Sequence, residues 1–257
     1  MSTADVTSGA DRATREPLHF GRIVVIGGGC YGSWYTQQLT RAIGRGALHA
    51  REIVVVDRDP HCTVADRLAS GAYAGAPVHL VLSTWADYLH TWLDAGPDAV
   101  ADDAMVPSPL MPHLCLDWLM DRAATRWPGR AMQVTPLSNT PPVPWERAAP
   151  DGRHYVSFAT WTCPVNCIEP SRCPATRDSR NWSMPVAISR FASREPSVRG
   201  AAIFHCAHRT YGVGMIDAVA IANADQLLAS WGGEGPCTML VGTVSHCHGA
   251  LGLLALS

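Results

Sequence analysis

The sequence of 257 residues contains no lysine, since all 20 of its basic residues are arginine. This absence excludes mechanisms that depend on a Schiff-base lysine or on the lysine of a P-loop. Charged residues make up only 16% of the chain, and the formal net charge is −2. Because no basic stripe stands out, nucleic acid is not expected as a main partner. The G-x-S-x-G, H-E-x-x-H and EF-hand patterns are missing as well.

Long hydrophobic runs are also missing. The most apolar stretch, residues 238–257, is interrupted by His246, Cys247 and His248 and falls short of the roughly 18 apolar residues that indicate a membrane span. Residues 1–18 are polar and lack the apolar region of a secretory signal, so we expect a disordered tail there. These features predict a cytoplasmic protein without a membrane span and with reduced cysteines.

Strand-like and helix-like patterns alternate along the remaining chain. Strands are predicted at residues 23–26, 52–57, 78–82, 154–161, 201–206 and 238–245, and helices at 33–46, 84–93, 112–119 and 217–233. This alternation predicts one α/β domain over 19–257, with a doubly wound, mostly parallel sheet covered by helices on both faces. Residues 136–200 are rich in proline and cysteine and are expected to form an inserted metal-binding loop.

A glycine motif lies between the first predicted strand and the first predicted helix. Residues 27–32, Gly-Gly-Gly-Cys-Tyr-Gly, fit the pattern G-x-G-x-x-G. In this pattern the first glycine permits a tight turn, the second allows a pyrophosphate to approach, and the third lets the helix pack on the strand. An acidic residue ends the next strand, 25 residues after the last glycine. The candidate cofactor-binding residues are Gly27, Gly29, Cys30, Tyr31, Gly32 and Asp57.

Over about 40 residues this segment resembles the Rossmann dinucleotide-binding proteins. The resemblance implies a Rossmann-like sheet with NAD(P) or FAD at the glycine turn and its ribose near Asp57. A carboxylate at that position favours NAD over NADP, although the neighbouring Arg58 would suit a 2′-phosphate. The same geometry also serves S-adenosylmethionine enzymes.

Three of the nine cysteines, Cys163, Cys167 and Cys173, follow one another with the spacing C-x3-C-x5-C, and two of them precede proline. Closely spaced thiols beside proline look like an iron–sulfur loop, in which Cys-Pro resembles the end of the bacterial ferredoxin motif. The spacing departs from the ferredoxin pattern and from the paired C-x2-4-C units of zinc knuckles. A 4Fe-4S cluster is favoured, zinc is the runner-up, and metal-free redox thiols are a third reading.

A cubane cluster normally takes four cysteines, so a fourth ligand must come from elsewhere in the chain. Cys206, at the end of the predicted strand 201–206, is the first choice. Cys247 is the second, and a neighbouring histidine is the third. If these strands run parallel to the first strand, their carboxyl ends share one edge with the glycine turn. The remaining cysteines, Cys30, Cys62, Cys115 and Cys237, are expected to be ordinary small side chains.

Together these motifs favour an oxidoreductase or electron-transfer protein in which a bound dinucleotide is coupled to an iron–sulfur cluster. Its partner would be a small-molecule substrate or a redox partner. One alternative is a non-catalytic sensor of redox state, iron or oxygen that binds a nucleotide. Another is a zinc-stabilised transferase that uses S-adenosylmethionine.

Overall fold

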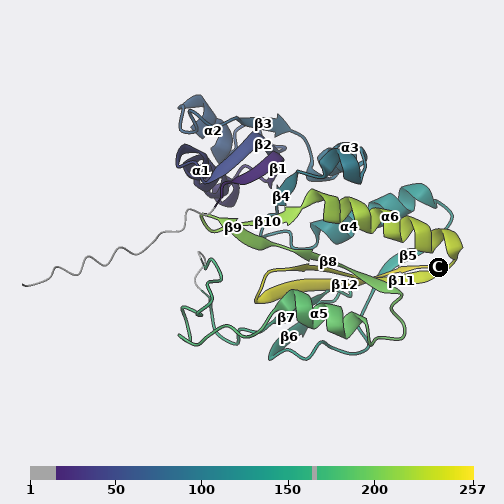
Figure 1. Cartoon of the computed structure of the whole chain (residues 1–257). Helices are drawn as coiled ribbons and strands as arrows, with labels where there is room; N and C mark the ends of the chain where they lie inside the picture. The colour runs from purple at the N-terminus through teal and green to yellow at the C-terminus, as the bar shows by residue number, and fades with distance from the viewer. Residues whose placement is uncertain (1–15, 164–166) are drawn as a thin grey trace, which may run out of the picture.

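The computed structural model describes residues 16–163 and 167–257 (Figure 1). Its α-helices are α1 (Cys30–Gly44), α2 (Thr63–Ala69), α3 (Trp85–Leu93), α4 (Leu114–Arg126), α5 (Met184–Ala192) and α6 (Ala218–Glu234), with a short 3-10 helix at Pro97–Val100. The strands are β1 (Leu18–Ile26), β2 (Leu48–Asp57), β3 (Val78–Leu82), β4 (Ala104–Val106), β5 (Met132–Thr135), β6 (Trp145–Ala148), β7 (His154–Ser157), β8 (Gly200–His205), β9 (Ala207–Thr210), β10 (Val213–Asp217), β11 (Cys237–Val244) and β12 (His248–Leu256).

Local sequence patterns explain the first elements. In β1, Ile23 and Val25 face one core cluster while Val24 and Ile26 face another, which is the two-residue period of a strand buried on both sides. Helix α3 begins after Thr84, whose Oγ1 accepts a hydrogen bond from the Asp87 amide at 3.2 Å. The Thr84 side chain therefore caps the amino end of this helix.

The strands form two mixed sheets. The first has the order β3-β2-β1-β4-β10-β9, in which the first four strands are parallel and β10 is antiparallel to both of its neighbours. The second has the order β6-β7-β12-β11-β8, with β5 also paired to β12, and only β8 and β11 are parallel in it. The prediction of a doubly wound, mostly parallel Rossmann-like sheet is therefore wrong.

Hairpin strands account for this difference. The C-terminal stretch 238–257 folds as two long antiparallel strands, β11 and β12, joined by a three-residue turn at 245–247. A similar short turn at 211–212 joins β9 to β10. The predicted insertion at 136–200 supplies β6, β7 and α5, and the two strands extend the second sheet beyond β12. Short hairpin turns produce antiparallel pairs, whereas the parallel arrangement needs a long crossover between strands.

The two sheets are connected by almost continuous backbone. Strand β8 pairs with β11 in the second sheet, and β9, which follows after the single residue Cys206, pairs with β10 in the first. Because β10 is antiparallel to both β4 and β9, strand β9 runs in the same sense as β1 and β4. The chain thus crosses from one sheet to the other at Cys206.

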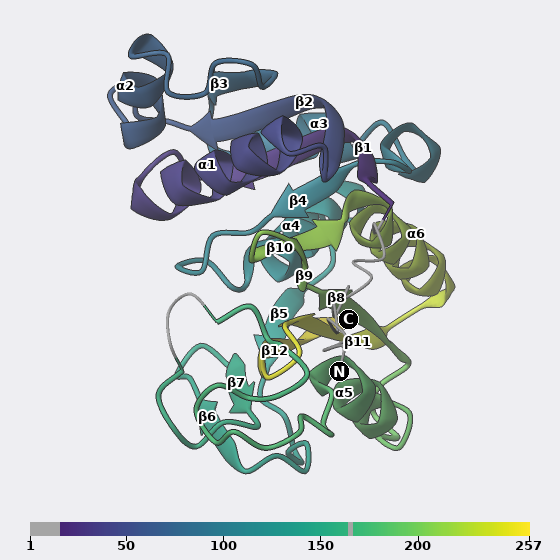
Figure 2. The same cartoon turned by 60° about the vertical axis from the view of Figure 1, so that its left-hand side comes forward.

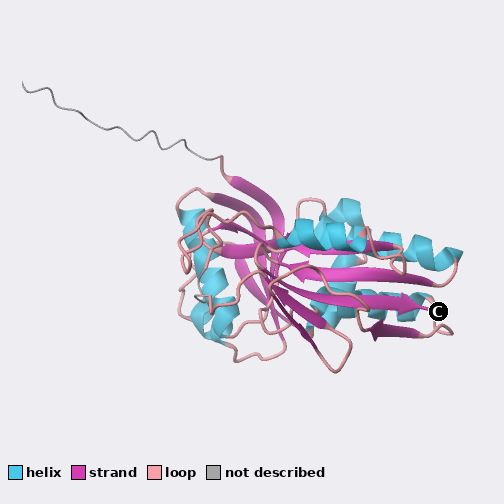
Figure 3. Ribbon diagram, turned by 90° about the horizontal axis from the view of Figure 1, so that it is seen from below, coloured by secondary structure: helices cyan, strands magenta, loops and turns pink. Residues whose placement is uncertain are grey.

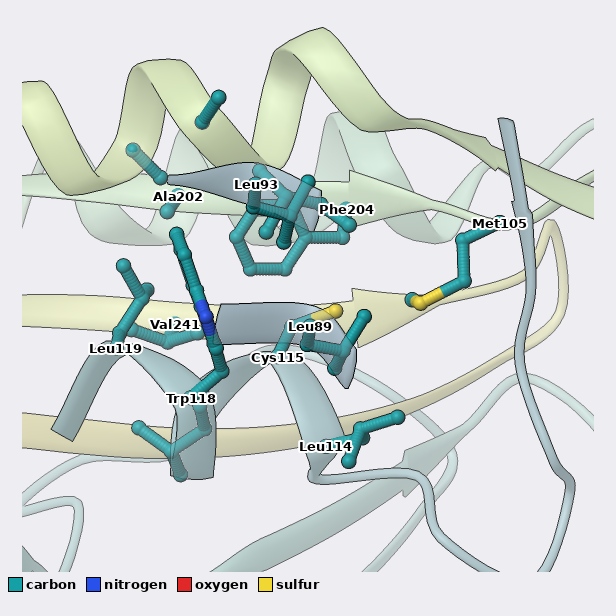
Figure 4. Close-up of a cluster of buried hydrophobic side chains, with 14 of the residues drawn as sticks. Leu89, Leu93, Met105, Leu114, Cys115, Trp118, Leu119, Ala202, Phe204 and Val241 are labelled. Atoms are coloured by element: carbon teal, nitrogen blue, oxygen red, sulfur yellow. The ribbon is translucent and has the colours of Figure 1, made fainter. Parts of the chain in front are cut away.

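One hydrophobic cluster includes residues of both sheets (Figure 4). Phe204 of β8 and Val241 of β11 meet Met105 of β4, together with Trp118 of α4 and Leu89 of α3. A second cluster lies between the first sheet and α1, and a third lies between the second sheet and α5. Figure 2 accordingly shows α1 and α2 at one end of the molecule and α5 at the other. Figure 3 shows the strands of both sheets fanning across the molecule.

Two further expectations concern the termini and the membrane. Residues 1–15 of the expected tail lie outside the described residues, and β1 already begins at Leu18. Within 16–163 and 167–257, the helices are all too short or too polar to cross a bilayer.

Candidate functional site

The glycine turn joins β1 to α1. Gly27 has a φ of 89°, which glycine adopts without strain and other residues rarely do. A Cβ atom added at Gly32 would lie 1.7 Å from the Gly27 carbonyl oxygen, so the third glycine of the motif is required by packing. At Gly29 an added Cβ would meet nothing within 4 Å. The middle glycine therefore leaves open space, which is where the motif would admit a phosphate group.

The amino end of α1 opens onto this space. Gly29 is the N-cap of the helix, provides no side-chain cap, and no acidic residue lies in the first turn, which contains Cys30 and Tyr31. The first amides of a helix have no acceptor within it and carry partial positive charge. Asp57, at the end of β2, accepts a hydrogen bond from the Gly28 amide at 2.6 Å and one from the Asp59 amide at 2.9 Å. Its carboxylate is thus held beside the glycine turn.

The cysteine segment forms a second feature. Cys163, Cys167 and Cys173 line one cavity of about 280 Å³ together with Cys247, from the turn between β11 and β12. We call this cavity the thiol pocket. Its wall also includes Glu169, Arg180, His208, Ser245 and His248. The four thiols therefore come from two segments that are far apart in the sequence.

Glu169 fastens these two segments together. Its carboxylate accepts hydrogen bonds from Ser245 Oγ at 2.7 Å, the His246 amide at 2.8 Å and the Cys247 amide at 3.0 Å. Burial raises the pKa of Glu169, but the hydrogen bonds from Ser245, His246 and Cys247 outweigh it and hold that pKa below its usual value. Glu169 has a φ of 51°, a backbone conformation that costs energy for a residue other than glycine. Its strained backbone and bound carboxylate fix the cysteine loop against the turn that contains Cys247.

The thiols of the pocket have unlike surroundings. Burial raises the pKa of Cys163, and the nearby Cys167 and Cys173 raise it further. Hydrogen bonding from the backbone of Thr176 lowers the pKa of Cys173. Burial raises the pKa of Cys247, while Trp182, whose indole nitrogen donates to the sulfur at 3.3 Å, opposes the shift. Cys173 is therefore more readily converted to thiolate than Cys163 or Cys247.

Cys206, the first choice as fourth ligand, lies outside the wall of the thiol pocket. Its sulfur faces β10, since a Cβ added at Gly214 would lie 2.6 Å from it. Burial raises the pKa of Cys206 to about 12, and the charge of Glu169 adds to the shift. It lines a separate cavity, which shares Pro109, Ser245 and His248 with the thiol pocket. The structure therefore brings Cys247, the second choice, to the three loop cysteines.

Three wall groups of the thiol pocket lack a hydrogen-bond partner within the described residues. These are Trp161 Nε1, Arg180 Nε and His208 Nδ1, and all three atoms are buried. A buried polar atom without a partner costs free energy, so these atoms are available to bond a group placed in the pocket. In the described ranges, His, Cys, Asp and Glu side chains do not gather in threes or more closely enough to hold one metal ion.

Helix α1 and the cysteine loop both lie against the tip of the β9–β10 hairpin. A Cβ added at Gly212 would lie 2.7 Å from Ile168 of the cysteine loop and 3.8 Å from Trp34 of α1. Since α1 begins at the glycine turn, the hairpin links the two sequence motifs through side-chain packing. The sequence pattern did not point to Glu169 or to this contact. Glu169 stands two residues after Cys167, but nothing in the pattern distinguishes it from an ordinary loop residue.

The other predicted residues have simpler places. Cys62, Cys115 and Cys237 are buried and Cys30 is exposed. His248 Nδ1 lies 3.0 Å from Ser157 Oγ. His205 and His246 line a neighbouring cavity that shares Glu169 and Arg180 with the thiol pocket.

Comparisons with known proteins bear on the C-terminal part. No curated protein matches the chain, and no solved structure matches it. Residues 115–257 match the family model AF_1314_C, described as "Uncharacterized protein, C-terminal domain". The matched range extends from α4 to β12 and contains Cys206 and every residue that lines the thiol pocket except Pro109, whereas the glycine turn precedes it. As the match covers more than half of its residues, the chain belongs to the AF_1314_C family.

Proposed function

We propose that the protein is an oxidoreductase or electron-transfer protein with an iron–sulfur cluster in the thiol pocket and a dinucleotide, NAD(P) or FAD, at the glycine turn. The observation that carries the proposal is that Cys163, Cys167, Cys173 and Cys247 line one cavity. The first and the last of these are 84 residues apart in the sequence (247 − 163). Four thiols are also the usual ligand number of such a cluster.

The size and wall of the cavity favour a cluster over a single zinc ion. At about 280 Å³ it has room for several atoms, since one water molecule takes up about 30 Å³ in the liquid. A zinc ion would instead draw its four thiolates to about 2.3 Å from one point. A thiolate-ligated cluster is negatively charged and its sulfurs accept hydrogen bonds. The unpartnered Arg180 Nε supplies both positive charge and a donor at the wall.

Each residue near the pocket has a distinct role in this proposal. Cys163, Cys167, Cys173 and Cys247 would hold the cluster, which supplies one-electron transfer when it is bound. Glu169 holds the Cys247 turn in place through the hydrogen bonds already described. Trp182 donates a hydrogen bond to the Cys247 sulfur, and hydrogen bonds to cluster sulfurs help to set the reduction potential.

At the glycine turn, Gly29 and the first amides of α1, those of Cys30, Tyr31 and Gly32, would receive the pyrophosphate, and Asp57 would accept hydrogen bonds from a ribose. A reducing cytoplasmic environment would keep the thiols available for the cluster. The partner would be a small-molecule substrate or a redox partner.

Anaerobic purification followed by absorption spectroscopy and by iron and sulfide analysis tests the proposal. We expect a broad charge-transfer band at about 400 nm, with iron and acid-labile sulfide in similar amounts. Zinc without sulfide would establish the zinc reading instead. A sample reconstituted with iron and sulfide that still contains neither would overturn the cluster assignment.

Single cysteine variants test which thiols hold the cluster. Cys247→Ser is expected to lose most of the iron, whereas Cys206→Ser is expected to keep it. Cys237→Ser is the matched control, because Cys237 is buried at the opposite end of β11. Full iron content in Cys247→Ser together with its loss in Cys206→Ser would reverse the ligand assignment made from the pocket.

A further inference from the structure

A second cavity, of about 400 Å³, adjoins the thiol pocket and has a partly aromatic wall. Tyr35 of α1 and Tyr155 of β7 line it, together with the proline-rich segment that follows β4. We call it the tyrosine pocket. Among the described residues of its wall, none is Asp, Glu or Arg, so a positively charged group would find no carboxylate there. An apolar wall with few polar groups is the usual make-up of a small-molecule site.

Strand register places one wall of the tyrosine pocket beside the glycine turn. Strand β4 ends at Val106, which pairs with Val25 of β1, so Pro107 of the pocket wall lies next to the carboxyl end of β1. Strand β2 pairs with the other side of β1 and ends at Asp57, next to the same end. Adjacent strands lie about 4.8 Å apart, so Asp57 and Pro107 flank the start of the glycine turn on opposite sides.

A dinucleotide at the glycine turn would therefore have its two halves on opposite sides of β1. With its pyrophosphate at Gly29 and one ribose at Asp57, its other half extends toward Pro107 and the tyrosine pocket. Helix α1, which begins at the glycine turn, reaches the same pocket at Tyr35. The ring at that end of the dinucleotide thus has a cavity of its own beside the turn.

We infer that the dinucleotide is FAD and that its isoalloxazine ring lies in the tyrosine pocket. The nicotinamide of oxidised NAD(P) carries a positive charge, for which the wall offers no carboxylate, whereas the oxidised flavin ring is uncharged. The fused rings of isoalloxazine also fill a cavity of about 400 Å³ better than a single pyridine ring does. Tyr155 offers an aromatic face for stacking, and its hydroxyl is held 3.0 Å from His113 Nε2.

The position of the pocket agrees with this choice of cofactor. The tyrosine pocket shares Pro109, Ser245 and His248 with the thiol pocket, so a ring bound there lies next to the four thiols. Nicotinamides transfer hydride, whereas flavins take part in both hydride and one-electron chemistry. A flavin is therefore the ring that can exchange single electrons with a neighbouring cluster. The inference rests on the proposed nucleotide site at the glycine turn, whereas binding of the ring does not require the cluster.

Calorimetry on the full chain with FAD, NAD⁺ and ADP tests the choice of cofactor. ADP carries the adenosine and the pyrophosphate but has no second ring. We expect FAD to bind about tenfold or more tightly than either of the others, because its ring alone fills the pocket without bringing a positive charge into it. An affinity for FAD no higher than that for ADP or for NAD⁺ would overturn the inference.

A pair of variants locates the ring. Ser108→Trp places a large side chain in the pocket and should reduce the affinity for FAD to that for ADP, with the affinity for ADP itself unchanged. Leu110→Trp, at a residue that is 75% exposed and does not line the pocket, should change neither affinity. Circular dichroism and urea unfolding of both variants establish that they fold. If folded Ser108→Trp binds FAD as the native chain does, the pocket is not the site of the ring.

A spectrum of the native chain gives a check that needs no variant. The visible absorption band of bound FAD, recorded as a difference against the same sample without FAD, should show the resolved shoulders of a flavin in apolar surroundings. The smooth band of free FAD would instead mean that the ring stays in water, and this outcome would contradict the inference.

The ADP measurement separates this inference from the proposed function. Binding of ADP without added affinity for FAD would keep the glycine turn as a nucleotide site and remove the ring from the tyrosine pocket. Failure of all three nucleotides to bind would remove the nucleotide site itself and the inference with it. Tight FAD binding by a chain that takes up no iron would leave the ring assignment standing and remove the cluster.

Discussion

The carboxylate of Glu169 joins the cysteine loop to the β11–β12 turn, and its removal should destabilise the protein by an amount that the structure allows us to work out. It accepts three hydrogen bonds, from Ser245 Oγ and from the amides of His246 and Cys247. Hydrogen bonds to charged groups contribute about 1.5–3 kcal/mol each, and a buried amide left without an acceptor costs about 1–3 kcal/mol. Glu169→Ala strands the His246 amide and leaves the Cys247 amide only its longer bond to Ser245 Oγ at 3.3 Å, so we expect a loss of about 4 kcal/mol.

Two further substitutions divide this cost into its parts. In Glu169→Gln the amide oxygen can still serve Ser245 and Cys247, but the amide nitrogen then faces the His246 N–H, and two donors meet. We expect a loss of about 2 kcal/mol for this variant. Glu169→Gly loses the carboxylate but relieves the positive φ of 51°, so it should be about 1 kcal/mol more stable than Glu169→Ala.

Urea unfolding followed by circular dichroism measures these differences in stability. The comparison requires that the unfolding free energy depends on urea concentration with the same slope in every variant. Glu195→Gln is the matched control, since Glu195 interacts with Asn139 at the surface and should change stability by less than about 0.5 kcal/mol. If Glu169→Gln unfolds at the same urea concentration as the native protein, the hydrogen bonds do not hold the turn.

The pH dependence gives an independent check on the same residue. The folded state holds the pKa of Glu169 below its usual value, so the stabilisation is present above the unfolded pKa of about 4.3. It is lost as the pH falls through the lower folded value. The stability difference between the native protein and Glu169→Gln should therefore be constant near neutral pH and shrink only in acid. A difference that shrinks on the alkaline side would contradict the reasoning.

Two other predictions concern the glycine turn and a buried histidine. Gly29→Ala should change stability by less than about 0.5 kcal/mol, because the added methyl meets nothing within 4 Å, yet weaken NAD or FAD binding in calorimetry about tenfold or more. Native nucleotide affinity in Gly29→Ala would exclude the glycine turn as the nucleotide site. Gly32→Ala should instead destabilise the fold by about 2–4 kcal/mol, because its methyl group clashes with the Gly27 carbonyl. Burial, with a smaller effect of Arg153, lowers the pKa of His113 from 6.5 to about 4. The unfolded chain therefore binds a proton at a higher pH than the folded one, and stability should fall by about 3 kcal/mol at most as the pH drops from about 6.5 to about 4. His113→Gln should flatten this part of a urea-unfolding pH profile, and an unchanged profile would exclude His113 as its source.

Local patterns in the sequence predicted many of the elements, but the pairing of strands was beyond them. The period of apolar residues locates β1, β3, α1 and α6, since side-chain burial in one strand or helix depends on near neighbours. Whether two strands pair in parallel or antiparallel depends on the connection between them. The histidines around Cys247 were treated as an interruption of an apolar run, although polar residues between two apolar strands are also what a hairpin turn requires.

The choice between Cys206 and Cys247 shows where sequence reasoning about the candidate site ended. Both cysteines were expected at the carboxyl end of a strand, and both lie there in the structure, next to β8 and β11. Cys206 joins two strands, and its sulfur faces the backbone of β10 at Gly214. Cys247 lies in a hairpin turn that Glu169 holds beside the cysteine loop. This difference depends on a tertiary contact between segments that the spacing of cysteines does not specify.

The single residue between β8 and β9 also relates the strand directions of the two sheets. Strand β9 runs in the same sense as β1 and β4, and it continues directly from β8, to which β11 is parallel. The carboxyl ends of β1 and β11, which lead into the glycine turn and the Cys247 turn, are thus related through strand pairing and a one-residue connection. Strand ladders are ordered by backbone hydrogen bonds and deform less than long loops. The relative placement of the two motifs is therefore a property of the strands, and an insertion at Cys206 should disturb it more than a substitution there.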